Sequence, residues 1–100
     1  MTQKIKIGIN GFGRIGRNLF RLLWNHPSIE VVAINDVADA ATLAHLLKYD
    51  SIHGRFNEEI AHENSKILIK DKGIPVLQHL HPKEIDWSKH QVKIVVEASG

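Results

Sequence analysis

The sequence predicts an α/β protein built on a doubly wound parallel sheet that is incomplete and carries a β-hairpin insertion. Three observations predict this class. A strand pattern, a glycine-rich turn and a helix pattern follow one another directly in residues 5–23. A second apolar strand pattern ends in an acidic residue, about 20 residues after the last of these glycines. A third strongly apolar strand pattern lies near residue 97, and a short hairpin pattern precedes it.

The first strand is expected to end at Asn10, because isoleucine alternates with lysine and glycine over residues 4–10. Gly11, Gly13 and Gly16 then form G-x-G-x-x-G, in which the glycines permit a tight turn, backbone approach to a pyrophosphate, and close helix–strand packing. Alone, the glycines would fit an ordinary flexible turn; with strand, helix and acid they indicate a Rossmann-type dinucleotide site. The candidate cofactor-binding residues of this segment are Asn10, Gly11, Phe12, Gly13, Arg14, Ile15 and Gly16.

A helix is expected from residue 14, because the apolar period changes there from two to about 3.6 residues. Its start would present unpaired N–H groups and the positive end of the helix dipole to phosphates. The predicted core-facing stripe is Ile15, Leu19, Leu22 and Leu23. The arginines off this stripe, expected near solvent or phosphate, are Arg14, Arg17 and Arg21. His26 and Pro27 end the helix.

The second strand is expected over residues 30–35, and Asp36 follows it directly. A carboxylate at that place can accept hydrogen bonds from both hydroxyls of an adenine ribose. A 2′-phosphate would instead meet a like charge, with no arginine, lysine or serine at Val37 or Ala38 to offset it. We therefore expect NAD as the cofactor in preference to NADP. The plainer alternative is that Asp36 is a helix N-cap or a solvated loop acid.

Shorter elements are expected to follow. Asp39 is a plausible N-cap of a helix that runs to about Tyr49 and carries Leu43, Leu46 and Leu47, and residues 50–57 resemble a loop. Residues 66–70 and 74–77 are predicted strands of a hairpin, with Gly73 in the left-handed conformation of its turn. Pro82 opens a short helical turn, and residues 92–97 are predicted to form an apolar strand.

Composition fits one soluble intracellular domain, with 43% hydrophobic and 24% charged residues. The net charge of +2 and the pI near 9.1 come from scattered lysines and arginines, so nucleic-acid binding is not specifically expected. The chain has no cysteine, which excludes disulfides and a thiol nucleophile within it. No apolar run approaches about 18 residues. We therefore expect no membrane span and a cytoplasmic location.

Two histidines and two tryptophans are further candidate site residues. His79 and His81 lie two residues apart and would point the same way on a strand end, as two ligands of one metal do. Because no third ligand is in view, they fit solvated loop residues better, and no metal site is expected. Trp24 and Trp87 are expected to pack rather than to stack on bases, since no aromatic cluster surrounds them.

The last predicted strand leads into Ser99-Gly100, where a fold of this class continues into a crossover helix. A parallel sheet must be covered on both faces. Residues 1–100 are therefore expected to be the N-terminal portion of an NAD-binding domain, with the catalytic domain outside this chain.

Several segments together resemble one family, the phosphorylating glyceraldehyde-3-phosphate dehydrogenases. The match begins with NGFGRIGR at residues 10–17 and continues with AIND at residues 33–36. It includes LLKYDS at residues 46–51, a segment particular to this family and its close relatives, and His53-Gly54. It extends to EASG at residues 97–100, and so covers nearly the whole chain.

The resemblance implies roles for six of the candidate site residues. The implied contacts are backbone groups of Arg14 and Ile15 on the pyrophosphate, Asp36 on the adenine ribose, Ser99 near the cofactor, and Asn10 and Asn35 as braces of the pocket. Two departures affect expected contacts. Leu80 stands beside the adenine where the family usually has arginine or lysine, and Ala98-Ser99 replaces the usual Ser-Thr or Cys-Thr pair.

The resemblance also implies the reaction of the parent enzyme. That enzyme would oxidise and phosphorylate glyceraldehyde 3-phosphate to 1,3-bisphosphoglycerate with NAD and inorganic phosphate, in glycolysis, as a cytoplasmic homotetramer. Its catalytic cysteine, histidine base and phosphate-binding residues would lie beyond Gly100, so this chain alone is expected to hold no catalytic residue and to be inactive. Two alternatives stay open: an erythrose-4-phosphate dehydrogenase, and a non-catalytic nucleotide- or RNA-binding module supported only by the basic pI.

Overall fold

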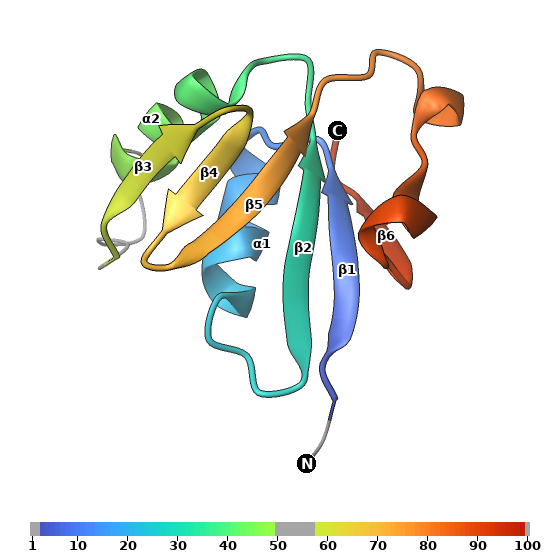
Figure 1. Cartoon of the computed structure of the whole chain (residues 1–100), viewed down its shortest axis with the longest axis horizontal. Helices are drawn as coiled ribbons and strands as arrows, with labels where there is room; N and C mark the ends of the chain where they lie inside the picture. Colours follow the sequence, from blue (N-terminus) through green and yellow to red (C-terminus); the bar gives the residue numbers. More distant parts are fainter. Residues whose placement is uncertain (1–2, 50–57, 100) are drawn as a thin grey trace.

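The computed structural model describes residues 3–49 and 58–99, and the predicted loop at residues 50–57 lies outside this part. The elements are β1 (Ile5–Asn10), α1 (Arg14–Leu23), β2 (Ile29–Asn35), α2 (Ala40–Tyr49), β3 (Ile60–Glu63), β4 (Lys66–Ile69), β5 (Lys72–Leu77), the 3-10 turns η1 (Pro82–Glu84) and η2 (Trp87–His90), and β6 (Ile94–Glu97). Figure 1 shows how they follow one another around a single sheet.

The sheet has six strands in the order β3-β4-β5-β2-β1-β6 (Figure 1). Its part β5-β2-β1-β6 is parallel, with β1 between β2 and β6. A first strand in the middle, with later strands added on both sides, is the arrangement of a doubly wound sheet. The predicted α/β class is therefore confirmed, although the sheet as a whole is mixed, because β3, β4 and β5 pair antiparallel.

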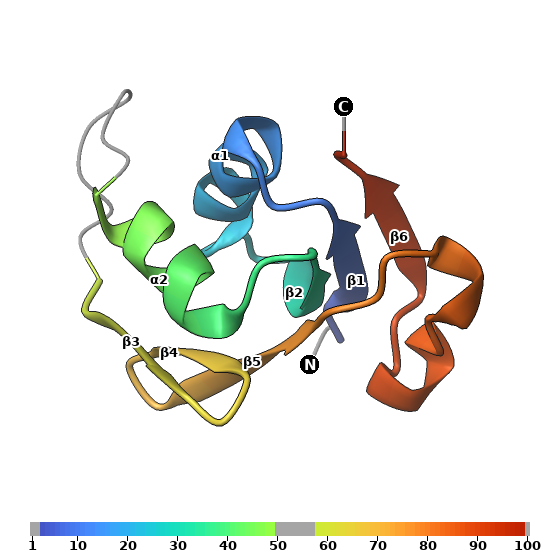
Figure 2. The same cartoon turned by 90° about the horizontal axis from the view of Figure 1, so that it is seen from above.

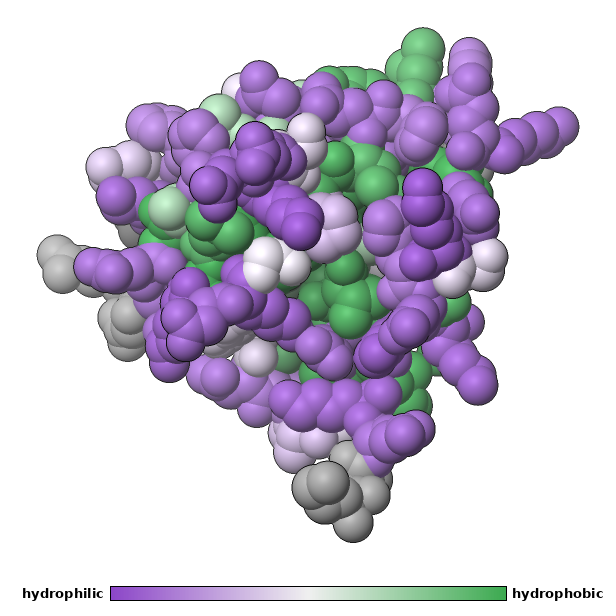
Figure 3. Space-filling view, in the orientation of Figure 1, coloured by the Kyte–Doolittle hydropathy of each residue, from purple (hydrophilic) through white to green (hydrophobic). Residues whose placement is uncertain are grey.

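Both helices cover the same face of the sheet, as Figure 2 shows from above. Helix α1 packs on β2, while α2 packs on β3 and β4. The largest fully buried side chains are Phe12, Phe20, Ile9, Ile34, Leu43, Leu47, Ile67, Ile69 and Ile74. The opposite face is mostly hydrophilic, but apolar side chains show between the charged ones over the middle of the sheet (Figure 3).

The face that α1 buries is set by Gly16. A Cβ at Gly16 would overlap the carbonyl oxygen of Gly11, so the helix approaches the end of β1 with this residue inward. Phe20, one turn further, is fully buried, whereas Ile15 and Leu22 are 67% and 78% exposed. The partly buried residues beside Phe20 are Leu19, Leu23 and Trp24. The predicted stripe was therefore wrong at Ile15 and Leu22, because the close approach of a glycine fixes the rotation of the helix.

The arginines of α1 divide between solvent and protein. Arg14 is exposed at the start of the helix. Arg17 donates to the carbonyl oxygen of Phe12 at 3.0 Å, and Arg21 donates to that of Leu47 at 3.0 Å. The expectation that all three lie near solvent or phosphate is wrong for Arg21, whose guanidinium joins α1 to the last turns of α2.

Helix α2 begins and packs much as predicted. The Oδ1 of Asp39 accepts from the Thr42 N–H at 2.8 Å, and the hydrogen bonds from Thr42 lower the pKa of Asp39. Leu43 and Leu47 are buried, but Leu46 is exposed, so the predicted leucine positions are right at two of three. Helices α1 and α2 have 10 residues each, and no helix in the described ranges is long and apolar enough to cross a bilayer.

The predicted hairpin is a three-stranded meander, and β3 was missed. Glu63 pairs with Lys66, so Asn64 and Ser65 form a two-residue turn, with φ of 49° and 66°. Such a pair of positive φ values is typical of the type I′ turn that suits hairpin twist. In the next turn Lys70 has φ 54°, whereas Gly73 already lies within β5. The left-handed assignment of Gly73 was therefore wrong.

Both tryptophans pack, as expected. Trp24 stacks on Phe20 with ring centroids 5.7 Å apart, and its Nε1 donates to Glu58 at 2.9 Å. Trp87 lies against Gly8 of β1 so closely that a Cβ there would overlap its ring. The η turns thus cover part of the face of the sheet that α1 and α2 leave open (Figure 2).

Candidate functional site

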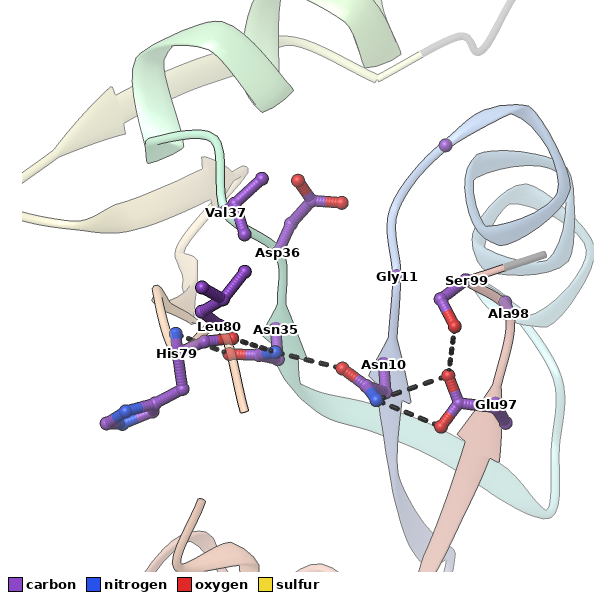
Figure 4. Close-up of a pocket in the computed structure, with 11 residues that line it drawn as sticks. Asn10, Gly11, Asn35, Asp36, Val37, His79, Leu80, Glu97, Ala98 and Ser99 are labelled. Atoms are coloured by element: carbon purple, nitrogen blue, oxygen red, sulfur yellow. Dashed lines mark hydrogen bonds between the residues drawn. The ribbon is translucent and has the colours of Figure 1, made fainter. Parts of the chain in front are cut away.

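A cavity of about 440 Å³ lies at the edge of the sheet where the parallel strands end (Figure 4). This is where open α/β sheets bind ligands, outside the carboxyl ends of the strands. Seven of the residues predicted from sequence line it: Asn10, Gly11, Gly13, Asn35, Asp36, Leu80 and Ser99. It therefore gathers residues from the ends of β1, β2 and β6 and from the segment after β5.

The glycine turn lines the cavity, and at Gly11 it lies too close to Ser99 for a side chain. Gly11 has φ 98°, and a Cβ there would come within 2.6 Å of the Cα of Ser99. At Gly13, by contrast, a Cβ would have no heavy atom of the described residues within 4 Å apart from the local backbone and chain neighbours. The N–H of Arg17 donates to the Gly13 carbonyl at 2.9 Å and opens the helix, so the N–H groups of residues 14–16 have no partner within α1.

Asp36 joins the glycine turn to the loop after β2. Its Oδ2 accepts from the N–H of Phe12 at 2.7 Å, and its Oδ1 accepts from the N–H of Ala38 at 3.0 Å. A carboxylate oxygen has two lone-pair sites, so each oxygen keeps capacity for a further donor. The carboxylate therefore faces the cavity while it holds the turn in place (Figure 4).

Two asparagines lie buried on the floor of the cavity. Asn35 Nδ2 donates to Asn10 Oδ1 at 2.9 Å, and Asn10 Nδ2 donates to the two carboxylate oxygens of Glu97 at 2.9 and 3.2 Å. Asn35 also receives the N–H of His79 at 3.0 Å and donates to its carbonyl at 3.1 Å. The polar chain runs across the ends of four strands (Figure 4).

Glu97 is exposed at the mouth of the cavity and carries the charge of this chain of hydrogen bonds. The hydroxyl of Ser99 donates to Glu97 Oε1. This hydroxyl and the amide of Asn10 hold the pKa of Glu97 below its ordinary value. Glu97 is therefore ionised at neutral pH.

The remaining predicted residues lie around the cavity without lining it. The side chain of Phe12 is buried in the core, where it meets Phe20 edge to face with centroids 5.7 Å apart. Arg14 and Ile15 are exposed at the start of α1, and Gly16 is buried behind the turn. Four lining residues were not among the predicted cofactor-binding residues: Val37, His79, Glu97 and Ala98. The rule that ligands bind at strand ends pointed to Glu97 and Ala98, which end and follow β6.

His79 contributes its backbone to the cavity floor. Across residues 3–49 and 58–99, no group of three or more His, Cys, Asp or Glu side chains is placed to hold a metal.

A parallel sheet with its first strand central, a glycine turn and an acid at the end of the second strand defines a dinucleotide-binding domain of the Rossmann type. Comparison with known families is more specific. The chain belongs to the family described as glyceraldehyde 3-phosphate dehydrogenase, NAD binding domain, which matches residues 5–100. The resemblance and the NAD cofactor predicted from the sequence are thereby confirmed.

Individual relatives agree with the family. The chain is 53% identical over 95 residues to glyceraldehyde-3-phosphate dehydrogenase 1 of Bacillus cereus, covering 95% of this chain and 28% of that protein. It is 51% identical to glyceraldehyde-3-phosphate dehydrogenase of Geobacillus stearothermophilus and 49% identical to glyceraldehyde-3-phosphate dehydrogenase 1 of Bacillus subtilis, covering 96% of this chain and 29% of each relative. The chain thus spans less than a third of the length of these curated relatives.

Proposed function

We propose that this chain binds NAD in the cavity at the strand ends, with the pyrophosphate against the glycine turn and the adenine ribose on Asp36. The observation that carries this proposal is the placement of Asp36: one carboxylate faces the cavity and holds the N–H of Phe12 in the glycine turn. Gly13 lines the cavity, and the space beyond its Cα is open, so a ligand can approach the backbone there. The N–H groups at the start of α1, which have no partner within the helix, suit the phosphates.

Apolar surface beside Asp36 suits the adenine ring. Val37 and Leu80 both line the cavity, from the loops after β2 and β5, and they are 65% and 70% exposed. Large exposed apolar side chains at a cavity favour a flat, largely apolar ligand group. Leu80 brings no charge to this wall, so its proposed contact with adenine is apolar.

Asp36→Asn is expected to weaken NAD binding roughly 10-fold to 100-fold, because hydrogen bonds to a charged group contribute about 1.5 to 3 kcal/mol. The substitution also removes the like charge that opposes a 2′-phosphate, so the preference for NAD over NADP narrows. Dissociation constants for both cofactors provide the measurement. Asp39→Asn is the matched control, since asparagine can keep the cap of α2. Equal affinity of the unmutated protein for NAD and NADP would contradict the role of Asp36.

We propose further that the parent enzyme is a phosphorylating glyceraldehyde-3-phosphate dehydrogenase, a glycolytic, cytoplasmic homotetramer. The names of the relatives support this substrate over erythrose 4-phosphate. In the implied reaction a thiolate adds to the aldehyde, hydride passes to NAD, and phosphate releases the acyl group as 1,3-bisphosphoglycerate. The share of residues 1–100 in this reaction is to hold NAD, as the N-terminal portion of its binding domain.

The 100-residue chain alone is expected to form no NADH from glyceraldehyde 3-phosphate, NAD and phosphate. The chain has no cysteine, and a serine hydroxyl without a positioned base does not replace a thiolate as nucleophile. The measurement is absorbance of NADH over time, with a full-length relative as the positive control. NADH formation by the chain itself would show that the proposed division of labour is wrong.

A further inference from the structure

We infer that Glu97 is a positioning residue of this site: its carboxylate orients the buried amides of Asn10 and Asn35, and through them holds the far wall of the cavity at His79–Leu80. The inference rests on the proposed binding of NAD in this cavity. The inference concerns a residue that the sequence motifs do not assign to the cofactor. Through this residue, the wall of the cavity beside β6 is linked to the wall after β5, on the other side of β1 and β2.

The two asparagines are the buried polar side chains of the described part of the chain. Buried amides need partners for both ends, because an unpaired polar group away from water is costly. Asn10 meets this need between Glu97 on β6 and Asn35 on β2. Asn35 meets it between Asn10 and the backbone of His79.

The charge on Glu97 determines which groups donate and which accept along this row of hydrogen bonds. An ionised carboxylate only accepts hydrogen bonds, so Asn10 must turn its NH₂ toward Glu97 and its oxygen toward Asn35. Asn35 must then offer its NH₂ to Asn10, which leaves its oxygen for the N–H of His79. A flipped amide at Asn10 would set oxygen against carboxylate and NH₂ against NH₂. The charge therefore selects the orientation of Asn10, and Asn35 is held in the matching orientation by Asn10 on one side and by both backbone groups of His79 on the other.

Both walls of the cavity are joined to this row of hydrogen bonds. On the near side, the Ser99 hydroxyl donates to Glu97, and the backbone of Ser99 packs against Gly11 of the glycine turn. On the far side, both backbone groups of His79 are held by Asn35, and the next residue is Leu80, which projects exposed into the cavity (Figure 4). Glu97 itself is exposed, so packing does not explain its contacts.

The test is to measure the dissociation constant for NAD in the full-length protein. Glu97→Ala is expected to weaken binding about tenfold, the size of a lost charged hydrogen bond. Glu97→Gln keeps an acceptor for Asn10 and should restore most of the affinity. Glu63→Gln, an equal charge change on exposed β3, is the matched control and should leave binding unchanged.

A double-substitution cycle separates positioning from a local structural role. Leu80→Ala removes the wall that Glu97 is inferred to hold, and because this side chain is 70% exposed we expect the substituted protein to fold. If Glu97 acts through that wall, adding Glu97→Ala to Leu80→Ala costs at most about threefold instead of about tenfold. Should Glu97→Ala fail to fold, the same cycle is run with Glu97→Asp, whose shorter side chain withdraws the carboxylate from Asn10 and whose penalty must likewise shrink.

The contrary outcomes are distinct. The inference is overturned if Glu97→Ala binds NAD with unchanged affinity, or if the two penalties in the cycle simply add. In either case the proposed function still stands, as long as the unmutated protein binds NAD. Absence of NAD binding by the unmutated protein would overturn the proposed function and this inference with it.

Discussion

Gly16→Ala is expected to destabilise the fold by about 3 kcal/mol, the upper part of the range for overpacked sites. For a domain of about 100 residues this lowers the melting temperature by roughly 12 to 24 °C. The added Cβ would overlap the carbonyl oxygen of Gly11, and that oxygen belongs to backbone. It has nowhere to retreat, because a Cβ at Gly11 itself would already be within 2.6 Å of Ser99. Relief requires that α1 move away from β1.

The measurement is thermal unfolding of the substituted and unmutated proteins. Gly73→Ala is the matched control, because the nearest atom to its Cβ would be the Cδ of Lys66 at 3.2 Å, on a flexible side chain. We expect that control to stay within about 1 kcal/mol of the unmutated protein. A Gly16→Ala protein that melts at the unmutated temperature would show that helix and turn are not packed this closely.

Local chemistry explains why the first third of the chain was predictable. Strand, glycine turn, helix and acid at residues 5–36 are each specified by neighbouring residues, through period and turn geometry. The phase of α1 is the instructive exception. The apolar period alone favoured Ile15 and Leu22, yet the same glycine motif that defined the turn places Gly16 against it and so turns these two outward.

The meander was only partly predictable, because backbone pairing between its strands defines it more than the hydrophobic pattern of its sequence does. In β3 only Ile60 is buried, so no alternation marks this strand, and its ladder to β4 is made by backbone. Its turn uses Asn64 and Ser65 at positive φ, without the glycine that usually announces such a turn. In the following turn the register of β4 and β5 places Gly73 opposite Leu68, and Lys70 takes the left-handed position instead.

The position of a candidate site residue was predictable where it follows from the motif itself, as the position of Asp36 at the cavity does. The contacts of Glu97 and His79 with the asparagines were not predictable, because they exist only once the strands are assembled into the sheet. The partners Glu97 and His79 are 87 and 44 residues from the asparagines they bind. No spacing rule joins residues so far apart, and only the sheet order brings their strand ends together.

Gly13→Ala is expected to leave stability within about 1 kcal/mol and to weaken NAD binding roughly 10-fold to 100-fold. Gly13 has φ −75° and open space beyond its Cα, so alanine is tolerated by the protein itself. Loss of a good N-cap and the gain from a less flexible unfolded chain, each up to about 1 kcal/mol, oppose one another. What alanine obstructs is the approach of a pyrophosphate to the backbone, a clash of about 1.4 to 2.8 kcal/mol in the complex.

The measurement pairs melting temperature with the dissociation constant for NAD on the same samples. Gly13→Ala should separate the two quantities, whereas Gly16→Ala lowers the melting temperature and raises the dissociation constant, and Gly73→Ala changes neither. The separation is diagnostic because, apart from the local backbone and chain neighbours, no described atom lies within 4 Å of the added methyl group, so a binding defect there reports the ligand. If Gly13→Ala binds NAD as tightly as the unmutated protein does, the pyrophosphate does not lie against this turn.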